Sequence, residues 1–184
     1  MRQGDVSKLS DIKQIFPVVA KVPDAQVMSD LDATVDWALK SAQVNSNKLG
    51  ITGFCWGGRI TWLYAAHNPQ IEAGVAWYGR LVGDATELMP KQPIDIASTL
   101  SVPILGLYGG KDAGIPLDTV QQMRDALGGS RSDHRLQSGS SKSEIVVYPD
   151  APHAFFADYR PSYREKEAYD GWQRLQAWFK QHGV

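Results

Sequence analysis

Cys55, Asp112 and His153 have side chains that could together perform nucleophilic catalysis. A thiol becomes a strong nucleophile when a base removes its proton, and histidine is the side chain best suited to do this near neutral pH. A carboxylate can then hold the imidazole in the correct tautomer and stabilise its cation. The order along the chain, nucleophile, acid and then histidine, is also found in hydrolases whose nucleophile lies on a strand-to-helix turn. The three residues therefore predict a catalytic triad with a cysteine nucleophile.

The sequence around Cys55 is the most specific signal. Residues 53–58 read Gly-Phe-Cys-Trp-Gly-Gly, the pattern of a sharp strand-to-helix turn with cysteine in place of serine. The glycines suit such a turn because strand and helix backbones approach too closely for side chains. A helix N-terminus next to Cys55 would favour a thiolate. The backbone N–H of Trp56 is the predicted donor to a reaction oxyanion.

These residues also allow other interpretations. A single cysteine is more often a small buried hydrophobic residue, and Asp112 in Gly-Gly-Lys-Asp could serve only the turn. Segment 53–60 approaches a phosphate-binding loop, but Arg59 and Ile60 replace the required lysine and hydroxyl. Glutamine amidotransferases share a G-x-C-x-G turn, yet their usual His-x-Glu pattern is missing after His153. Without paired cysteines or an H-E-x-x-H motif, we expect no metal and no cofactor.

The elements that must position these residues alternate between helices and strands. Apolar periodicity predicts helices at about 23–41, 59–67, 117–127 and 162–182, and strands at about 49–54, 71–78, 102–108 and 144–148. The strands are apolar with little alternation, which is typical of a parallel sheet covered on both faces. We therefore expect an α/β three-layer sandwich with a mostly parallel sheet. The carboxyl ends of parallel strands share one edge, where the three candidate residues would meet.

Composition excludes several classes of protein. The 184 residues carry 19 Lys and Arg against 20 Asp and Glu, so no basic excess favours nucleic acid. No apolar run approaches the roughly 18 residues of a membrane span. A lone cysteine and the absence of a secretory leader pattern predict a cytoplasmic protein. The expected partner is a small molecule, without nucleic acid or membrane.

Taken together, these motifs resemble the dienelactone hydrolase family, a branch of the α/β-hydrolase fold. The resemblance rests on the segment around Cys55, Tyr-Gly-Gly-Lys-Asp ending at Asp112, Asp-Ala-Pro-His-Ala-Phe around His153, and Val-Ala-Trp-Tyr-Gly at 75–79. It extends from Arg2 to the last helix. It implies hydrolysis of carboxylic esters or lactones through an acyl-enzyme on Cys55, with Asp112 and His153 completing the triad.

The resemblance also suggests substrate contacts. Family members that take dienelactone bind its carboxylate with arginines, and Met1-Arg2-Gln3-Gly4 resembles one arginine-bearing segment, so Arg2 is a candidate anchor. The second position, four residues after the histidine, holds Ala157 here, and the nearest later arginine is Arg160. This departure argues against dienelactone itself as the substrate, but it does not argue against cleavage of esters or lactones. Further expected substrate contacts are Trp77, Tyr78 and Phe155, which together with Trp56 would form an apolar, aromatic pocket for a small ester.

A larger departure concerns the N-terminal side. Family members have strands before the arginine-bearing segment that supply a second oxyanion donor and a glutamate, and neither can be placed here. We therefore expect residues 1–184 to be a single α/β-hydrolase domain that is N-terminally incomplete and lacks its first strands. Strand 49–54 would then expose an unpaired edge and promote self-association. Loss of one oxyanion donor costs about 10²- to 10³-fold in turnover, so a weakly active or inactive remnant is the alternative.

Overall fold

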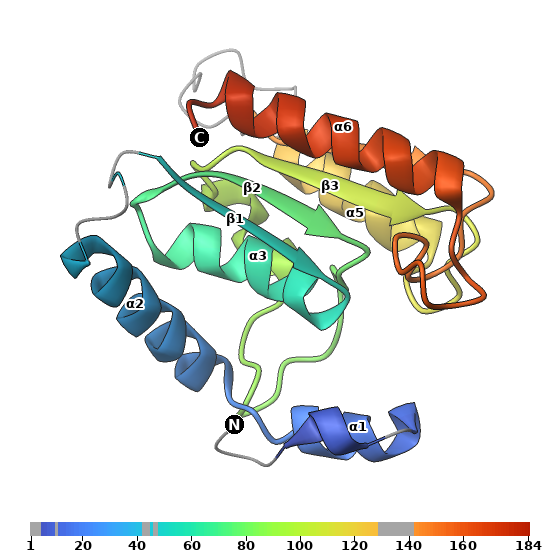
Figure 1. The fold of residues 1–184 in the computed structure, drawn as a ribbon, viewed down its shortest axis with the longest axis horizontal. Coiled ribbons are helices and arrows are strands. Elements are labelled where there is room, and N and C mark those ends of the chain that lie inside the picture. Colours follow the sequence, from blue (N-terminus) through green and yellow to red (C-terminus); the bar gives the residue numbers. More distant parts are fainter. Residues whose placement is uncertain (1–4, 10, 42–44, 46–47, 129–141) are drawn as a thin grey trace.

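The sheet consists of four parallel strands within the described residues (Figure 1). The computed structural model describes residues 5–9, 11–41, 45, 48–128 and 142–184. The strands are β1 (Leu49–Phe54), β2 (Ile71–Trp77), β3 (Ile104–Gly109) and β4 (Glu144–Tyr148), and they lie in the order β1-β2-β3-β4. The α/β class and the parallel sheet predicted from the sequence are confirmed.

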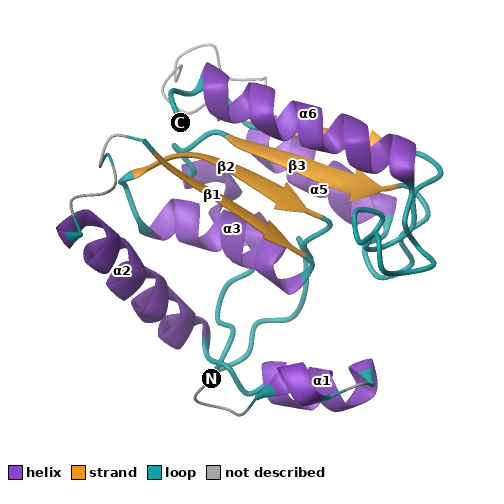
Figure 2. Ribbon diagram, in the orientation of Figure 1, coloured by secondary structure: helices purple, strands orange, loops and turns teal. Residues whose placement is uncertain are grey.

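Helices cover both faces of this sheet, which gives three layers (Figure 2). Helices α3 (Trp56–His67) and α5 (Leu117–Gly128) lie on one face, and α6 (Glu165–Gln181) lies on the other (Figure 1). Helix α6 is amphipathic, and the residues that it buries at helical spacing are Ala168, Gly171, Leu175 and Trp178. This face of α6 therefore packs against the core.

The central and edge strands differ in burial. Every residue of β3 is buried, as expected for a strand covered on both faces. In β1, exposed residues alternate with partly buried ones, and Phe54 is 39% exposed. Among the described residues β1 pairs only with β2, from Leu49 opposite Ile71 to Phe54 opposite Trp77. One side of β1 is therefore an edge of the sheet.

Several elements differ from the sequence prediction. Helix α3 begins at Trp56, not at residue 59, because the Gly-Gly pair that suggested a turn is helical here. Helix α2 spans Asp24–Lys40, close to its prediction. The unpredicted elements are η1 (Val6–Lys8), α1 (Ile12–Val19), α4 (Pro93–Ile96) and η2 (Ala97–Thr99). Short helices carry too few residues to show periodicity, and α1 contains a proline.

No helix in the described part of the chain is long and apolar enough to cross a membrane.

Candidate active site

Cys55 occupies a sharp turn between β1 and α3. Its backbone has φ 54° and ψ −116°, a conformation that L-residues rarely adopt. Two hydrogen bonds hold it: the Cys55 N–H donates to the Trp77 carbonyl at 3.0 Å, and the Cys55 carbonyl accepts from the Arg59 N–H at 3.2 Å. The residue is exposed. The turn therefore presents the thiol at the carboxyl edge of the sheet, as the sequence pattern predicted.

Backbone strain is concentrated around this turn. The described non-glycine residues with positive φ are Cys55, Tyr78 at 36° and Ala154 at 59°. They follow β1, β2 and His153 respectively. Such strained residues persist only where their surroundings fix them, and they often mark functional sites.

Two adjacent glycines in the first turn of α3 have different surroundings. A Cβ on Gly58 would lie 2.5 Å from the Trp77 carbonyl oxygen and 3.0 Å from the Gly79 nitrogen, whereas a Cβ on Gly57 would have no atom within 4 Å. The backbones of helix and strand therefore touch at Gly58. Of these two glycines, Gly58 alone is required for space.

Gly58→Ala should destabilise the protein by about 1–3 kcal/mol or more, because backbone atoms must move to admit the methyl group. Gly57→Ala is the matched control, and it should stabilise the chain by up to about 1 kcal/mol through helix propensity. Urea unfolding followed by circular dichroism measures both. Equal effects of the two substitutions would contradict the close contact.

Asp112 and His153 meet at the ends of β3 and β4. The His153 Nδ1 lies 2.6 Å from the Asp112 Oδ2. The other carboxylate oxygen, Oδ1, accepts the Gly114 N–H at 2.9 Å, and Asp112 is 5% exposed. The loops that carry both residues are joined by bonds from the Gly110 N–H to the Tyr148 carbonyl and from the Lys111 N–H to the Ala151 carbonyl. The carboxylate is thus fixed and aimed at the imidazole.

His153 links this carboxylate to the thiol. Its hydrogen bond with Asp112, followed by its hydrogen bond with Cys55, raises the pKa of His153 to about 9. The same hydrogen bond with His153 is the largest cause that lowers the pKa of the Cys55 thiol. Burial opposes both shifts. The geometry therefore favours a thiolate paired with an imidazolium, which is the reactive form of a cysteine nucleophile.

Two further groups act on the thiol. The backbone N–H of Trp56 hydrogen-bonds Cys55, and the positive charge of Arg160 also lowers the Cys55 pKa. The N–H that the sequence pattern names as an oxyanion donor therefore stabilises the negative charge of the thiolate. Arg160 stacks over the Tyr159 ring, 5.5 Å from its centroid. In the sequence, Arg160 is only the nearest arginine after His153. The effect of Arg160 on the thiol depends on the fold of the loop that follows His153.

The expected aromatic pocket is built differently from the prediction. Trp77 and Phe155 are fully buried and Tyr78 is 3% exposed, so Trp77 and Phe155 offer no surface to a substrate. Both side chains belong to the core beneath the site. Tyr78 meets the His153 ring edge-on at 5.1 Å between centroids, and burial raises its pKa. Arg2 lies outside the described residues.

Phe54 and Phe156 provide the accessible aromatic surface beside Cys55. Their rings stack at 5.2 Å, and Phe156 also lies 4.5 Å from Trp77. The sequence analysis predicted neither residue as part of the pocket, and it placed Phe54 only in the strand. A hollow of about 510 Å³ adjoins this surface, and its lining consists of Phe156, Tyr163, Glu165, Lys166, Ala168, Tyr169 and Trp172. Cys55, Asp112 and His153 are not among the residues that line this hollow.

Within the described ranges, no three His, Cys, Asp or Glu side chains gather as metal ligands would. The expected independence from metals and cofactors stays a prediction.

Comparison with known proteins identifies similar chains. The model of the dienelactone hydrolase family matches residues 1–183. A Methylorubrum extorquens protein named "Putative carboxymethylenebutenolidase" is 60% identical over the whole chain, which covers 60% of that protein. An Escherichia coli protein of the same name is 55% identical over 99% of the chain and 64% of its own length. The chain thus spans about three fifths of the length of these curated relatives.

A solved structure agrees with this result. The crystal structure described as "Putative Dienelactone Hydrolase" from Klebsiella pneumoniae is 56% identical and superposes with a TM-score of 0.87. The match covers 98% of this chain and 71% of the other. At this similarity the two chains share their fold.

Proposed function

Because the chain belongs to the dienelactone hydrolase family, we propose that it hydrolyses small carboxylic esters or lactones with Cys55 as the nucleophile. The observation that carries the proposal is the 2.6 Å hydrogen bond between Asp112 and His153, together with the lowering of the Cys55 pKa by His153. Metal or cofactor chemistry is not needed for this reaction. The substrate is expected to be a small molecule.

The reaction proceeds in two steps. The Cys55 thiolate attacks the ester carbonyl carbon, and the resulting oxyanion accepts a hydrogen bond from the Trp56 N–H. The His153 imidazolium then protonates the leaving alkoxide, which leaves an acyl-enzyme and a neutral imidazole. Neutral His153 removes a proton from water, which attacks the thioester, and the thiolate departs as the acid is released. Asp112 holds the His153 ring throughout.

An activated ester such as p-nitrophenyl acetate tests this proposal directly. The chain should release a burst of nitrophenol close to one equivalent, and mass spectrometry of peptides should find the acyl group on Cys55. An acyl group on another residue, or turnover without an acyl intermediate, would contradict the mechanism.

A second candidate is an enzyme that is acylated at Cys55 but turns over slowly. The sequence pattern predicts one oxyanion donor in this chain, the Trp56 N–H. Loss of one such donor costs about 10²- to 10³-fold in turnover. A burst followed by very slow deacylation would favour this candidate, and rapid steady-state hydrolysis would exclude it.

We also propose that the free edge of β1 promotes self-association. Edge strands without charged residues tend to pair with other chains, and β1 contains none. Sedimentation should show dimers or larger species that dissociate on dilution. Thr52→Lys, on an exposed position of β1, should weaken this association, whereas Thr34→Lys on exposed α2 should not. A single monomeric species at all concentrations would refute it.

The expected compartment is the cytoplasm, because a lone catalytic thiolate survives where thiols are kept reduced.

A further inference from the structure

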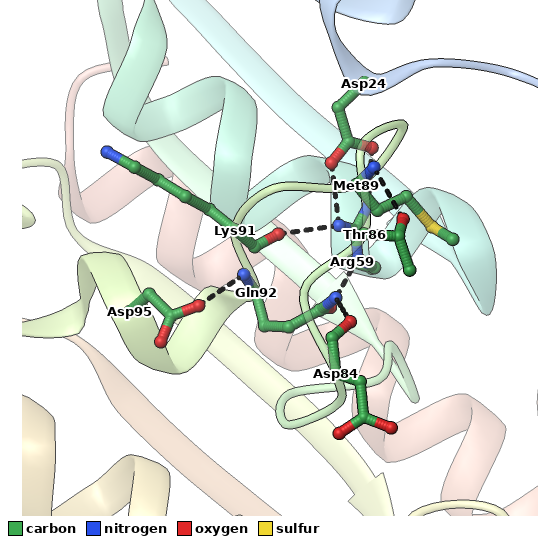
Figure 3. Close-up of polar contacts among 8 residues, drawn as sticks. All are labelled: Asp24, Arg59, Asp84, Thr86, Met89, Lys91, Gln92 and Asp95. Atoms are coloured by element: carbon green, nitrogen blue, oxygen red, sulfur yellow. Dashed lines mark hydrogen bonds and ion pairs between the residues drawn. The ribbon is translucent and has the colours of Figure 1, made fainter.

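Arg59 is a buried arginine whose guanidinium is held by two segments. It is 3% exposed, and its Nη1 and Nη2 donate to the two carboxylate oxygens of Asp24 at 2.7 and 2.8 Å. Its Nε donates to the Gln92 side-chain oxygen at 2.8 Å, and Nη2 also donates to the Lys91 carbonyl at 2.7 Å. Figure 3 shows these groups converging on the guanidinium. Arg59 is the residue that replaced the lysine of a phosphate-binding loop.

The partners of Arg59 are themselves fixed. Asp24 begins α2, is 7% exposed, and its N–H donates to the Leu88 carbonyl at 2.8 Å. The side-chain amide of Gln92 donates to the Asp84 carbonyl, and the Gln92 N–H donates to Asp95 at 2.7 Å (Figure 3). A buried network in which each group has a partner is rigid. Arg59 therefore joins α3 to α2 and to the segment after β2.

The same residue is bonded to the nucleophile. The Arg59 N–H donates to the Cys55 carbonyl at 3.2 Å and so closes the first turn of α3. A Cβ on Gly79 would collide with the Arg59 nitrogen, so this turn also packs directly against the segment that follows Tyr78. Both Cys55 and Tyr78 have positive φ. A strained backbone of this kind needs surroundings that fix it from several sides.

We propose that Arg59 is a positioning residue for Cys55. Its side chain anchors the first turn of α3 to Asp24 and Gln92, and this anchor keeps the strained nucleophile turn aligned with His153. The inference rests on the proposed function, because it assumes that Cys55 is the reacting group. Asp24 takes part through Arg59 and touches no reacting atom.

Alkylation of Cys55 by iodoacetamide across pH tests the proposal without requiring hydrolysis. The variant of choice is Arg59→Met with Asp24→Leu, which removes both charges of the buried pair together, so that neither charge is left without its counter-charge. A misplacement of about 1 Å can cost about 10²-fold in rate. We therefore expect alkylation at neutral pH and the acylation burst to slow about 10- to 10²-fold. The pH midpoint of alkylation should rise, and KM should change little. Arg59→Lys should recover part of the rate.

Controls separate positioning from folding. Arg174→Met with Asp170→Leu removes a half-exposed arginine–aspartate pair on α6, bonded at 2.6 Å, and should leave the alkylation rate unchanged. If urea unfolding shows that the Arg59 and Asp24 double variant is not folded, Asp24→Asn serves instead, because it keeps the shape of the carboxylate. A folded variant with the original rate and pH midpoint would overturn the positioning role. Unreactive Cys55 in the unaltered chain would instead refute the proposed function.

Discussion

Cys55→Ala should abolish both the acylation burst and the steady-state hydrolysis, with a loss of at least about 10³-fold in kcat. In the proposed mechanism Cys55 is the nucleophile that His153 activates, and Asp112 holds His153 by a hydrogen bond. The chain contains only this cysteine, so no other thiol can substitute. Stopped-flow detection of nitrophenol measures the burst, and product formation measures turnover.

Cys55→Ser is the matched control for this substitution. It keeps a hydroxyl at the same turn, but an alcohol does not ionise near neutral pH as a thiol does, so the burst should also be lost or greatly slowed. Both variants should unfold in urea near the midpoint of the unaltered chain, because Cys55 is exposed. Hydrolysis that survives in Cys55→Ala would remove Cys55 from the mechanism.

Asp112→Asn should lower kcat by up to about 10⁴-fold, as expected when the group that orients a catalytic histidine is neutralised. Asp112 is buried, and its Oδ2 lies 2.6 Å from the His153 Nδ1. An asparagine of the same shape loses the charge that stabilises the imidazolium. Its amide can also present a hydrogen to His153 and favour the wrong tautomer. Activity equal to that of the unaltered chain would contradict this role of Asp112.

The pH dependence provides an independent measurement for the same variant. The reactive ion pair requires a deprotonated Cys55, whose pKa is lowered, and a protonated His153, whose pKa is about 9. As the pH increases, the acylation rate should therefore rise at pH values below the ordinary pKa of a thiol. It should fall again above about pH 9. Removing the Asp112 charge should lower the pKa of His153 and raise the pKa of Cys55. The pH range in which acylation is fast should therefore become narrower on both its acid and its alkaline side. An alkaline limb that stays near pH 9 in Asp112→Asn would argue against this assignment.

Local sequence was sufficient to predict the main elements and the candidate triad. The apolar strands identified a buried parallel sheet, because residues covered on both faces have no polar alternation. The glycine-flanked Cys55 predicted a strained turn, because only small neighbours allow strand and helix backbones to touch. Chain order and strand ends placed Asp112 and His153 near each other, and they are 2.6 Å apart in the structure. These features depend on short segments, so the sequence carries them directly.

Contacts between distant segments were decided only by the tertiary structure. Trp77 and Phe155 looked like pocket residues because of their type and position, but packing against α6 and neighbouring rings buries them. The charge of Arg160 reaches the thiol only because of the loop after His153. In the sequence, Arg59 occupies the position of the lysine in a phosphate-binding loop. In the structure, hydrogen bonds to Asp24 and Gln92, which are 35 and 33 residues away, make it a buried anchor. Hydrophobic patterning specifies which face of an element is buried, whereas partners of buried charges depend on how whole elements pack.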